Sequence, residues 1–334
     1  MSRALDKDIA IVIPARNEAR RIGVALRALA GQSPDRVRVF VMINNTTDAT
    51  ARVARRQAAR CGLDLTIVQR SLDPGEGVGA ARRIGCAAAL RGMPGLRHIL
   101  NTDADCIAAP DWVARNLAHL QRADAVCGRI EPISSEAEVL AQMDPVAARN
   151  EGIYAALVRE FHARHAPHCA HLGGTHGQAA GASLAVTRAA YLAAGGFAPQ
   201  PCGEDRDLVR RLGQTRRRIV HADDVIVQAS CRLTGRAQGG MSDALRWRVA
   251  GGDYLVDDGL PRADTLLSAL KTGTLGAWPP LVSGQDRLLA SELPRHIDML
   301  SAWLNDGHMP AGPPCSESSA AGSPSRAFAT AAKG

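Results

Sequence analysis

Two short acidic segments of this chain combine residue types and spacing that could do chemistry. The first is Asp103-Ala104-Asp105, which is separated by two residues from the apolar pair Ile99-Leu100 of a predicted strand. In a turn, alternate carboxylates can converge on one hard cation, and Mg²⁺ or Mn²⁺ prefers oxygen ligands of this kind together with diphosphate oxygens. A solvated turn, or a cap for the next helix, is the other interpretation. Because the turn comes at the carboxyl end of a predicted strand, the metal-site interpretation is favoured over what the D-x-D pattern alone would indicate.

The second acidic segment, Gly203-Glu204-Asp205-Arg206-Asp207, opens a predicted helix after Pro201. Its three carboxylates could simply complement the positive end of the helix dipole. Alternatively, one of them is a general base that accepts a proton from an attacking hydroxyl group. A carboxylate over a helix N-terminus stays ionised, which suits a base and not an acid. Both interpretations stay open on local grounds.

A glycine-rich turn, Gly75–Gly79 with Gly77 at its centre, precedes a predicted helix that carries Arg82 and Arg83 in its first turn. Exposed backbone N–H groups at such a helix start could bind phosphate. The turn does not have the spacing G-x-G-x-x-G, and the segment after the first predicted strand lacks that motif as well. The sequence therefore disfavours a dinucleotide-binding enzyme.

Four predicted strands, each followed by a predicted helix, must position these residues. The strands are Ile9–Ile13, Val37–Ile43, Leu65–Val68 and the segment around Ile99–Leu100; the helices are Glu18–Ala30, a segment capped by Thr47 and Asp48 that runs to about Arg60, Ala80–Leu90, and Trp112–Leu120. Four such units with short connections predict an α/β fold, with a mostly parallel central sheet flanked by helices. Ligands of such sheets bind beyond the carboxyl ends of the strands. The segments of interest are therefore Pro14–Glu18, Asn44–Asp48, Ser71–Gly79 and Thr102–Asp105.

The second half of the chain has a different pattern. We expect a helix over Val146–His165, a strand over Ala182–Val186, and two further strands near Arg218–Val220 and Val225–Gln228. A helical portion begins at about Asp243. Residues 310–334 are rich in Ala, Gly, Ser and Pro and have no periodicity, which predicts a disordered tail.

Composition narrows the class of protein. With 334 residues, of which 46% are hydrophobic, the chain can bury a sizeable core. The formal net charge is +7, the basic residues are spread along the chain, and only 3% of residues are aromatic; this disfavours nucleic-acid binding. No segment has the length of apolar sequence that a membrane helix needs, the first residues do not resemble a secretion signal, and the eight cysteines form no C-x-x-C pair. We therefore expect a cytoplasmic protein with free thiols.

Taken in order, the motifs resemble those of the family 2 glycosyltransferases, which use nucleotide-diphosphosugars and have the GT-A fold. The resemblance runs from about Ile9 to Gln228. It is carried by Pro14-Ala15-Arg16-Asn17-Glu18, Asn44-Asn45-Thr46-Thr47-Asp48-Ala49-Thr50, Ala81-Arg82-Arg83-Ile84-Gly85, Thr102-Asp103-Ala104-Asp105, and the run Gly181-Ala182-Ser183, Arg188, Gly195-Gly196-Phe197 and Gly203-Glu204-Asp205.

The resemblance implies an inverting transfer of one sugar to an acceptor hydroxyl. Asp105, with Asp103, would hold a divalent metal ion that bridges the two phosphates of the donor. Asp205 would be the general base that deprotonates the acceptor, and Glu204 would position the acceptor or the base. The absence of the Q-x-x-R-W motif of processive membrane synthases agrees with transfer of a single sugar.

The resemblance also implies a set of residues that bind the nucleotide sugar. These are Pro14, Arg16, Asn17, Glu18, Asn44, Asn45, Asp48, Arg82 and Asp103. From the glycine-rich turn we add Gly77, and we add the hypothesis that Arg232 or Arg236, in a basic loop, closes over the diphosphate. The chain departs from the family at Asn44, where an Asp is usual, and at Gln228 and Ser230, where many relatives carry a histidine ligand. An amide can still both donate and accept hydrogen bonds.

We divide the chain into a glycosyltransferase domain over 1–235, a helical extension over 236–309, and the tail over 310–334. Residues 1–125 would form the nucleotide-binding half of the domain and residues 126–235 the acceptor-binding half. The expected partners are a nucleotide-diphosphate sugar and an acceptor that bears a hydroxyl group. Two alternatives are a sugar-1-phosphate nucleotidyltransferase and a non-catalytic protein that binds nucleotide sugars.

Overall fold

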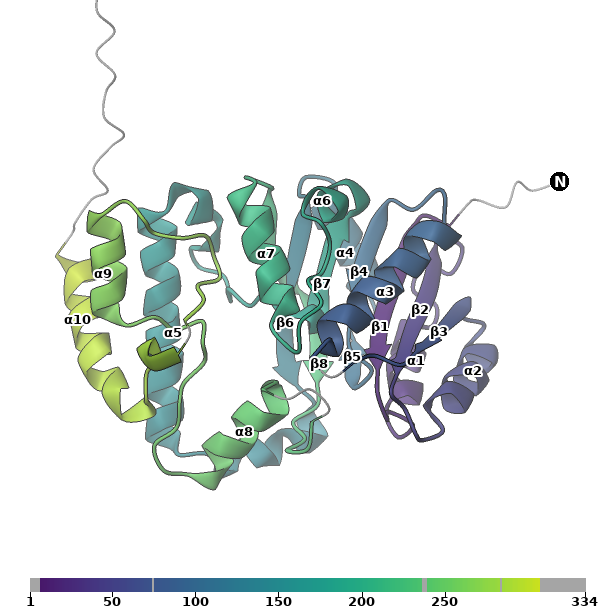
Figure 1. Ribbon diagram of the computed structural model, residues 1–334, viewed down its shortest axis with the longest axis horizontal. Coiled ribbons are helices and arrows are strands. Elements are labelled where there is room, and N and C mark those ends of the chain that lie inside the picture. Colours follow the sequence, from purple (N-terminus) through teal and green to yellow (C-terminus); the bar gives the residue numbers. More distant parts are fainter. Residues whose placement is uncertain (1–6, 74, 236–238, 283, 307–334) are drawn as a thin grey trace, which may run out of the picture.

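The chain folds around one central sheet (Figure 1). The computed structural model describes residues 7–73, 75–235, 239–282 and 284–306, so the predicted tail over 310–334 lies outside the described residues. Over the described residues the sheet has the strand order β3-β2-β1-β4-β7-β6-β8-β5. Its strands are β1 (Ile9–Ala15), β2 (Val37–Asn44), β3 (Leu65–Arg70), β4 (His98–Asn101), β5 (Cys106–Ala108), β6 (Ala125–Pro132), β7 (Leu184–Thr187) and β8 (Ile219–Ala229).

Helices and 3₁₀ segments connect the strands and follow the last one. The helices are α1 (Ile22–Leu29), α2 (Thr50–Cys61), α3 (Gly77–Gly92), α4 (Trp112–Leu120), α5 (Pro145–His165), α6 (Arg188–Ala193), α7 (Glu204–Gln214), α8 (Met241–Ala250), α9 (Ala263–Lys271) and α10 (Leu293–Asn305). The 3₁₀ segments are η1 (Ser134–Gln142), η2 (Pro167–Leu172), η3 (Gly181–Ser183), η4 (Gly284–Asp286) and η5 (Ala290–Glu292). None of the helices described here combines the length and the apolar character needed to cross a membrane.

The four predicted strand–helix units of the first half are confirmed. Strands β1 to β4 pair in parallel, with Ala15 beside Ile43 and Val12 beside Asn101, so their carboxyl ends lie at one edge of the sheet. The first helix begins at Ile22, four residues later than predicted, because the residues from Glu18 form a separate turn before it.

The second half completes the sheet with strands of mixed direction. Strand β7 is antiparallel to both β4 and β6, whereas β6 and β8 are parallel. The two strands predicted near Arg218–Val220 and Val225–Gln228 are one strand, β8. A register shift between Gly128 and Arg129 of β6 accommodates the irregular middle of β8, so the pairing continues through it.

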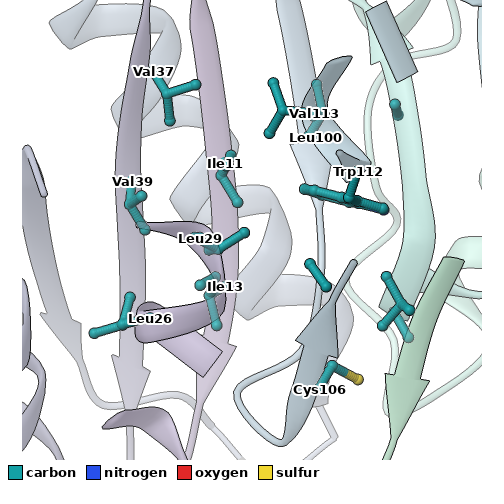
Figure 2. Packing of buried hydrophobic residues seen from close by; sticks show 14 of the residues in the cluster. Ile11, Ile13, Leu26, Leu29, Val37, Val39, Leu100, Cys106, Trp112 and Val113 are labelled. Carbon is teal, nitrogen blue, oxygen red and sulfur yellow. The ribbon is translucent and has the colours of Figure 1, made fainter. Parts of the chain in front are cut away.

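Apolar side chains cover both faces of the sheet because successive residues of a strand point to opposite faces. Ile11 and Ile13 of β1 pack on one face with Leu26 of α1 and Trp112 of α4 (Figure 2). Val12 of β1 packs on the other face, in a cluster that includes residues of α3 and α7. Strand β1 is therefore buried on both sides, as expected for a central parallel strand.

A third apolar cluster lies beside the sheet and joins α5 to the C-terminal helices α9 and α10 (Figure 1). Tyr154 and Phe161 of α5 are completely buried against side chains such as Leu266 and Leu300. The hydroxyl of Tyr154 also donates to the carbonyl oxygen of Pro261, at 2.5 Å. Helices α9 and α10 therefore pack on a helix that ends about 100 and about 130 residues before them.

Candidate active site

The carboxyl end of β4 presents the first acidic segment. A carboxylate oxygen of Asp103, one of Asp105 and the Sγ atom of Cys106 lie within 4.8 Å of one another. Burial raises the pKa of the Cys106 thiol well above its usual value, so this sulfur is a protonated and poor ligand. The two carboxylates are hard ligands in a partly buried turn. This donor set fits a Mg²⁺ or Mn²⁺ ion that takes its remaining ligands from water or phosphate.

Negative charge is concentrated in this turn. Burial, together with the charge of Asp103, raises the pKa of Asp105 to about 6, although the guanidinium of Arg232 acts in the opposite direction. A cation bound between the two carboxylates would relieve the repulsion between them.

A single arginine of α3 connects this turn to the second acidic segment. Arg82 donates from Nη2 to Oδ1 of Asp103 at 2.6 Å and from Nε to Oε1 of Glu204 at 2.8 Å. The side chains of Arg82 and Glu204 are each only 3% exposed. Two acidic segments that are a hundred residues apart in the sequence therefore meet at one buried guanidinium.

Asp205 lies at the start of α7, next to this contact. Its Oδ2 accepts from the backbone N–H of Gly181 at 2.6 Å, and its Oδ1 accepts from the backbone N–H of Arg206 at 2.7 Å. A Cβ atom added to Gly181 would overlap the guanidinium of Arg82, so the backbone of Gly181 lies close against that guanidinium. Burial and the charge of Asp205 raise the pKa of Glu204, against the effect of Arg82.

The third carboxylate of the segment has a different role. Asp207 contacts two arginines of its own helix, Arg211 at 2.6 Å and Arg210 at 3.7 Å. These contacts are the i, i+3 and i, i+4 pairs expected on a helix surface. The carboxylate of Asp207 thus pairs with arginines along α7, whereas the carboxylate of Asp205 is directed toward Gly181.

The loops after β1 and β2 are tied to each other by predicted site residues. The side chain of Asn17 accepts from the backbone N–H of Thr47 at 2.8 Å, and that of Asp48 accepts from the backbone N–H of Ala19 at 3.0 Å. Asn17 has a φ of 54°, which lies in the left-handed region. These two side chains shape the loops, and their contact with a nucleotide stays a prediction.

Several other predicted residues also hold the backbone. Asn45 both donates to and accepts from the backbone of Leu72, at 2.9 and 2.8 Å. Gly77 opens α3 with a φ of 55°, and a Cβ atom there would overlap the backbone of Pro201. The remaining members of the predicted set differ in exposure: Pro14 and Asn44 are buried, and Arg16 is exposed.

Arg232, one of the two arginines considered for the basic loop, enters the site from the segment after β8. Arg232 contacts both carboxylate oxygens of Glu18, at 2.6 and 2.8 Å, and its Nη2 lies 2.8 Å from Oδ2 of Asp105. Only the basic character of this segment pointed to it in the sequence. Arg236, the other arginine considered there, lies outside the described residues.

Comparison with known proteins identifies the family. The family model described as "Glycosyltransferase like family 2" matches residues 7–248, which is more than half of the chain. The sequence has no match among curated proteins.

Solved structures give the fold. The mannosyltransferase PcManGT from Pyrobaculum calidifontis, in complex with GDP-Man and Mn²⁺, has a TM-score of 0.50 and 17% identity; the match covers 90% of this chain and 74% of that chain. The S. aureus TarS 1-349 structure has a TM-score of 0.45 and 15% identity, over 67% of this chain and 60% of that chain. Glucosyl-3-phosphoglycerate synthase from Mycobacterium tuberculosis, in complex with Mg²⁺ and UDP, has a TM-score of 0.43 and 18% identity, over 73% and 76%.

The match to PcManGT confirms the predicted fold class, a mostly parallel α/β sheet of the GT-A type. The family match also confirms the predicted enzyme class. This chain is a glycosyltransferase and belongs to the glycosyltransferase family 2-like proteins.

Proposed function

We propose that this glycosyltransferase transfers one sugar from a nucleotide-diphosphate sugar to an acceptor hydroxyl, with inversion at the anomeric carbon. Asp205 is the general base, and Asp103 and Asp105 hold a divalent metal ion. The observation that carries the proposal is the Arg82 bridge, since it fixes the turn after β4 beside the start of α7. A donor held at the first segment and a base on the second can then face one another.

Asp103 and Asp105 are the residues that would bind the cation. When bound, the cation neutralises charge that builds up on the departing nucleoside diphosphate. The PcManGT complex contains GDP-Man and Mn²⁺, which supports the choice of donor class and of metal. Arg82 keeps the Asp103 carboxylate in place from the side of α3.

Asp205 accepts the proton of the acceptor hydroxyl. Each of its oxygens accepts one backbone N–H and retains a second lone-pair direction for the acceptor. As the proton moves to Asp205, the acceptor oxygen bonds to the anomeric carbon from the face opposite the leaving group. The bond from that carbon to the diphosphate oxygen breaks in the same displacement. Glu204 positions the base because its contact with Arg82 anchors the first residue of α7.

A pair of variants on one helix turn tests the role of Asp205. In Asp205→Asn, turnover should fall by about 10²–10⁴-fold, the usual contribution of a general base, while donor binding changes little. Asp207→Asn is the matched control, because the Asp207 carboxylate pairs with Arg210 and Arg211 on the side of the same helix. Release of nucleoside diphosphate from a panel of nucleotide sugars with Mn²⁺ gives turnover, and thermal shift with the same donors gives binding. Wild-type turnover in Asp205→Asn would refute the assignment of the base.

A further inference from the structure

The proposed metal site already contains a positive charge supplied by the chain itself. Arg232 lies between Asp105 and Glu18, with a side chain that is only 16% exposed. A guanidinium keeps its positive charge in proteins, and this one contacts Glu18 at 2.6 Å and Asp105 at 2.8 Å. Its guanidinium is therefore a fixed cation against one of the two proposed metal ligands.

The backbone next to Arg232 is anchored outside the site. Glu136 of η1 accepts from the hydroxyl of Ser230 at 2.7 Å and from the backbone N–H of Cys231 at 3.0 Å. Arg21 in turn donates to Glu136 at 2.6 Å. These contacts anchor Ser230 and the backbone of Cys231. A movement of Arg232 away from Asp105 would therefore mainly involve its long side chain.

Arg82 cannot take over the role of Arg232. It is already shared between Asp103 and Glu204. Among the described residues, Arg232 is thus the guanidinium that contacts both Asp105 and Glu18. A divalent ion on Asp105 would lie within a few ångströms of this guanidinium, and the two like charges would repel each other.

Both arginines also retain an unused donor. The Nε atom of Arg232 and the Nη1 atom of Arg82 are buried and have no hydrogen-bond partner among the described residues. Buried donors of this kind are costly unless an acceptor reaches them. A diphosphate supplies several acceptor oxygens and matches the geometry of a guanidinium.

From these contacts we infer that Arg232 and the divalent metal ion exclude each other at Asp105, so that Arg232 is a built-in competitor of the metal. The inference rests on the metal site of the proposed function. The metal ion binds weakly on its own because Arg232 must leave Asp105 first. A nucleoside diphosphate gives the displaced guanidinium a new anionic partner, so metal and nucleotide bind with positive coupling. Arg232 acts here as a positioning residue through Asp105 and Glu18.

Direct Mn²⁺ binding tests the inference without any measurement of activity. The signal of free Mn²⁺ in electron paramagnetic resonance gives the Kd of the metal alone, and a second titration with UDP or GDP present gives the coupling. Arg232→Gln should bind Mn²⁺ alone at least tenfold more tightly than the wild type, and the nucleoside diphosphate should then strengthen metal binding less. Arg232→Lys keeps the charge and should stay close to the wild type. Arg246→Gln, in an exposed ion pair of α8, is the matched control and should change nothing.

Two further variants separate the possible failures. The first is the double variant Glu18→Gln, Arg232→Gln. It removes the carboxylate that Arg232→Gln alone would leave unpaired, so it should fold even if the single variant folds poorly. The tighter Mn²⁺ binding should also appear in this double variant. Asp105→Asn should abolish the Mn²⁺ site. An unchanged or weaker Mn²⁺ affinity in both the single and the double variant, with the site still sensitive to Asp105→Asn, overturns the inference alone. Mn²⁺ binding that is missing in the wild type and in every variant overturns the metal site of the proposed function as well.

Discussion

Arg82 is the residue on which the geometry of the site depends most. Burial disfavours its charge, but the carboxylates of Asp103, Glu204 and Asp205 outweigh burial and raise the pKa of Arg82. The sequence resemblance implied a role for this arginine in binding the nucleotide sugar. In the structure its present partners are two carboxylates, and one of them, Glu204, is as deeply buried as Arg82 itself.

Replacement of Arg82 should therefore destabilise the fold as well as the site. In Arg82→Met, Glu204 loses its buried partner, and loss of one member of a buried ion pair costs about 3–5 kcal/mol. Urea unfolding measures this loss in the free energy of unfolding. Arg82→Met combined with Glu204→Gln should recover part of it, since no buried charge is then left unpaired. Arg91→Met, at an exposed position of the same helix, is the control; a loss below about 1 kcal/mol in Arg82→Met would contradict the buried-pair argument.

The sequence predicted which residues follow the strands, but not what their side chains contact. Asp103 and Asp105 could be chosen because a carboxylate pair after a buried strand lies at the ligand edge of such a sheet. The ion pair between Glu18 and Arg232 could not be predicted, because Arg232 is 214 residues away in the sequence. Nor does a loop motif reveal that Asn17 and Asn45 hold neighbouring backbone segments. Those contacts depend on the spacing between loops, which only the folded sheet sets.

At the scale of elements, the start of α3 fixes the segment that leads into α7. The backbone N–H of Gly79 donates to the carbonyl oxygen of Gln200 at 3.1 Å. A Cβ atom on Gly79 would overlap the carbonyl oxygen of Ala198 and lie 2.8 Å from the backbone nitrogen of Gln200. The glycine-rich turn, which we predicted as a phosphate site, therefore also serves a close contact between two backbones.

Two glycines of α3 allow a matched test of this contact. Gly79→Ala should lower the free energy of unfolding by about 1–3 kcal/mol, the usual cost of overpacking, and should lower turnover because the displaced segment carries Glu204 and Asp205. Gly92→Ala adds the same methyl group at the other end of the helix, where the nearest atoms lie at 3.9 Å in the Phe40 ring. It should change stability by less than about 1 kcal/mol. Equal effects of the two changes, measured by urea unfolding and by turnover, would argue against a special role for the contact of Gly79.

The prediction of elements was most successful where a segment is strongly apolar or periodic. Strand β1 and helix α5 were predicted to within about two residues of their observed bounds. The direction of β7 and the continuity of β8 could not be predicted, because both depend on pairing with strands that are distant in the sequence. In β8, the exposed pair Asp223 and Asp224 interrupts the apolar pattern, and the sequence therefore resembles two short strands.

For the molecule as a whole, the apolar cluster shared by α5, α9 and α10 crosses the proposed boundary at residue 235 between the glycosyltransferase domain and the helical extension. Tyr154 and Phe161 lie before that point, and Leu266 and Leu300 lie after it, in one common cluster. The division into a glycosyltransferase domain and a helical extension stays a proposal, and the shared cluster implies that the two parts stabilise each other. The family match, which ends at residue 248, also runs past the proposed point.

Buried neutral histidines should set how the stability of the whole molecule depends on pH. Burial, with smaller effects from His171, His176 and Arg159, lowers the pKa of His221 to about 3. In the unfolded chain it is near 6.5, so between these values the unfolded state binds one more proton and stability falls as the pH falls. Burial likewise lowers the pKa of His162 to about 4, which adds a contribution of the same sign.

The variant His221→Gln isolates the contribution of one such histidine. The free energy of unfolding of the wild type, minus that of His221→Gln, should decrease by about 2 kcal/mol between pH 7 and pH 5 because only the wild type loses stability through this group. Carboxylates that titrate in the same range are present in both proteins, so their effects cancel in the difference. His119→Gln is the control for the substitution itself, because the side chain of His119 is 31% exposed and lies 2.8 Å from Asp224. The decrease on acidification should be specific to His221→Gln. If urea unfolding gave the same dependence on pH for His221→Gln and the wild type, His221 would have to be accessible to protons in the folded protein, contrary to its burial.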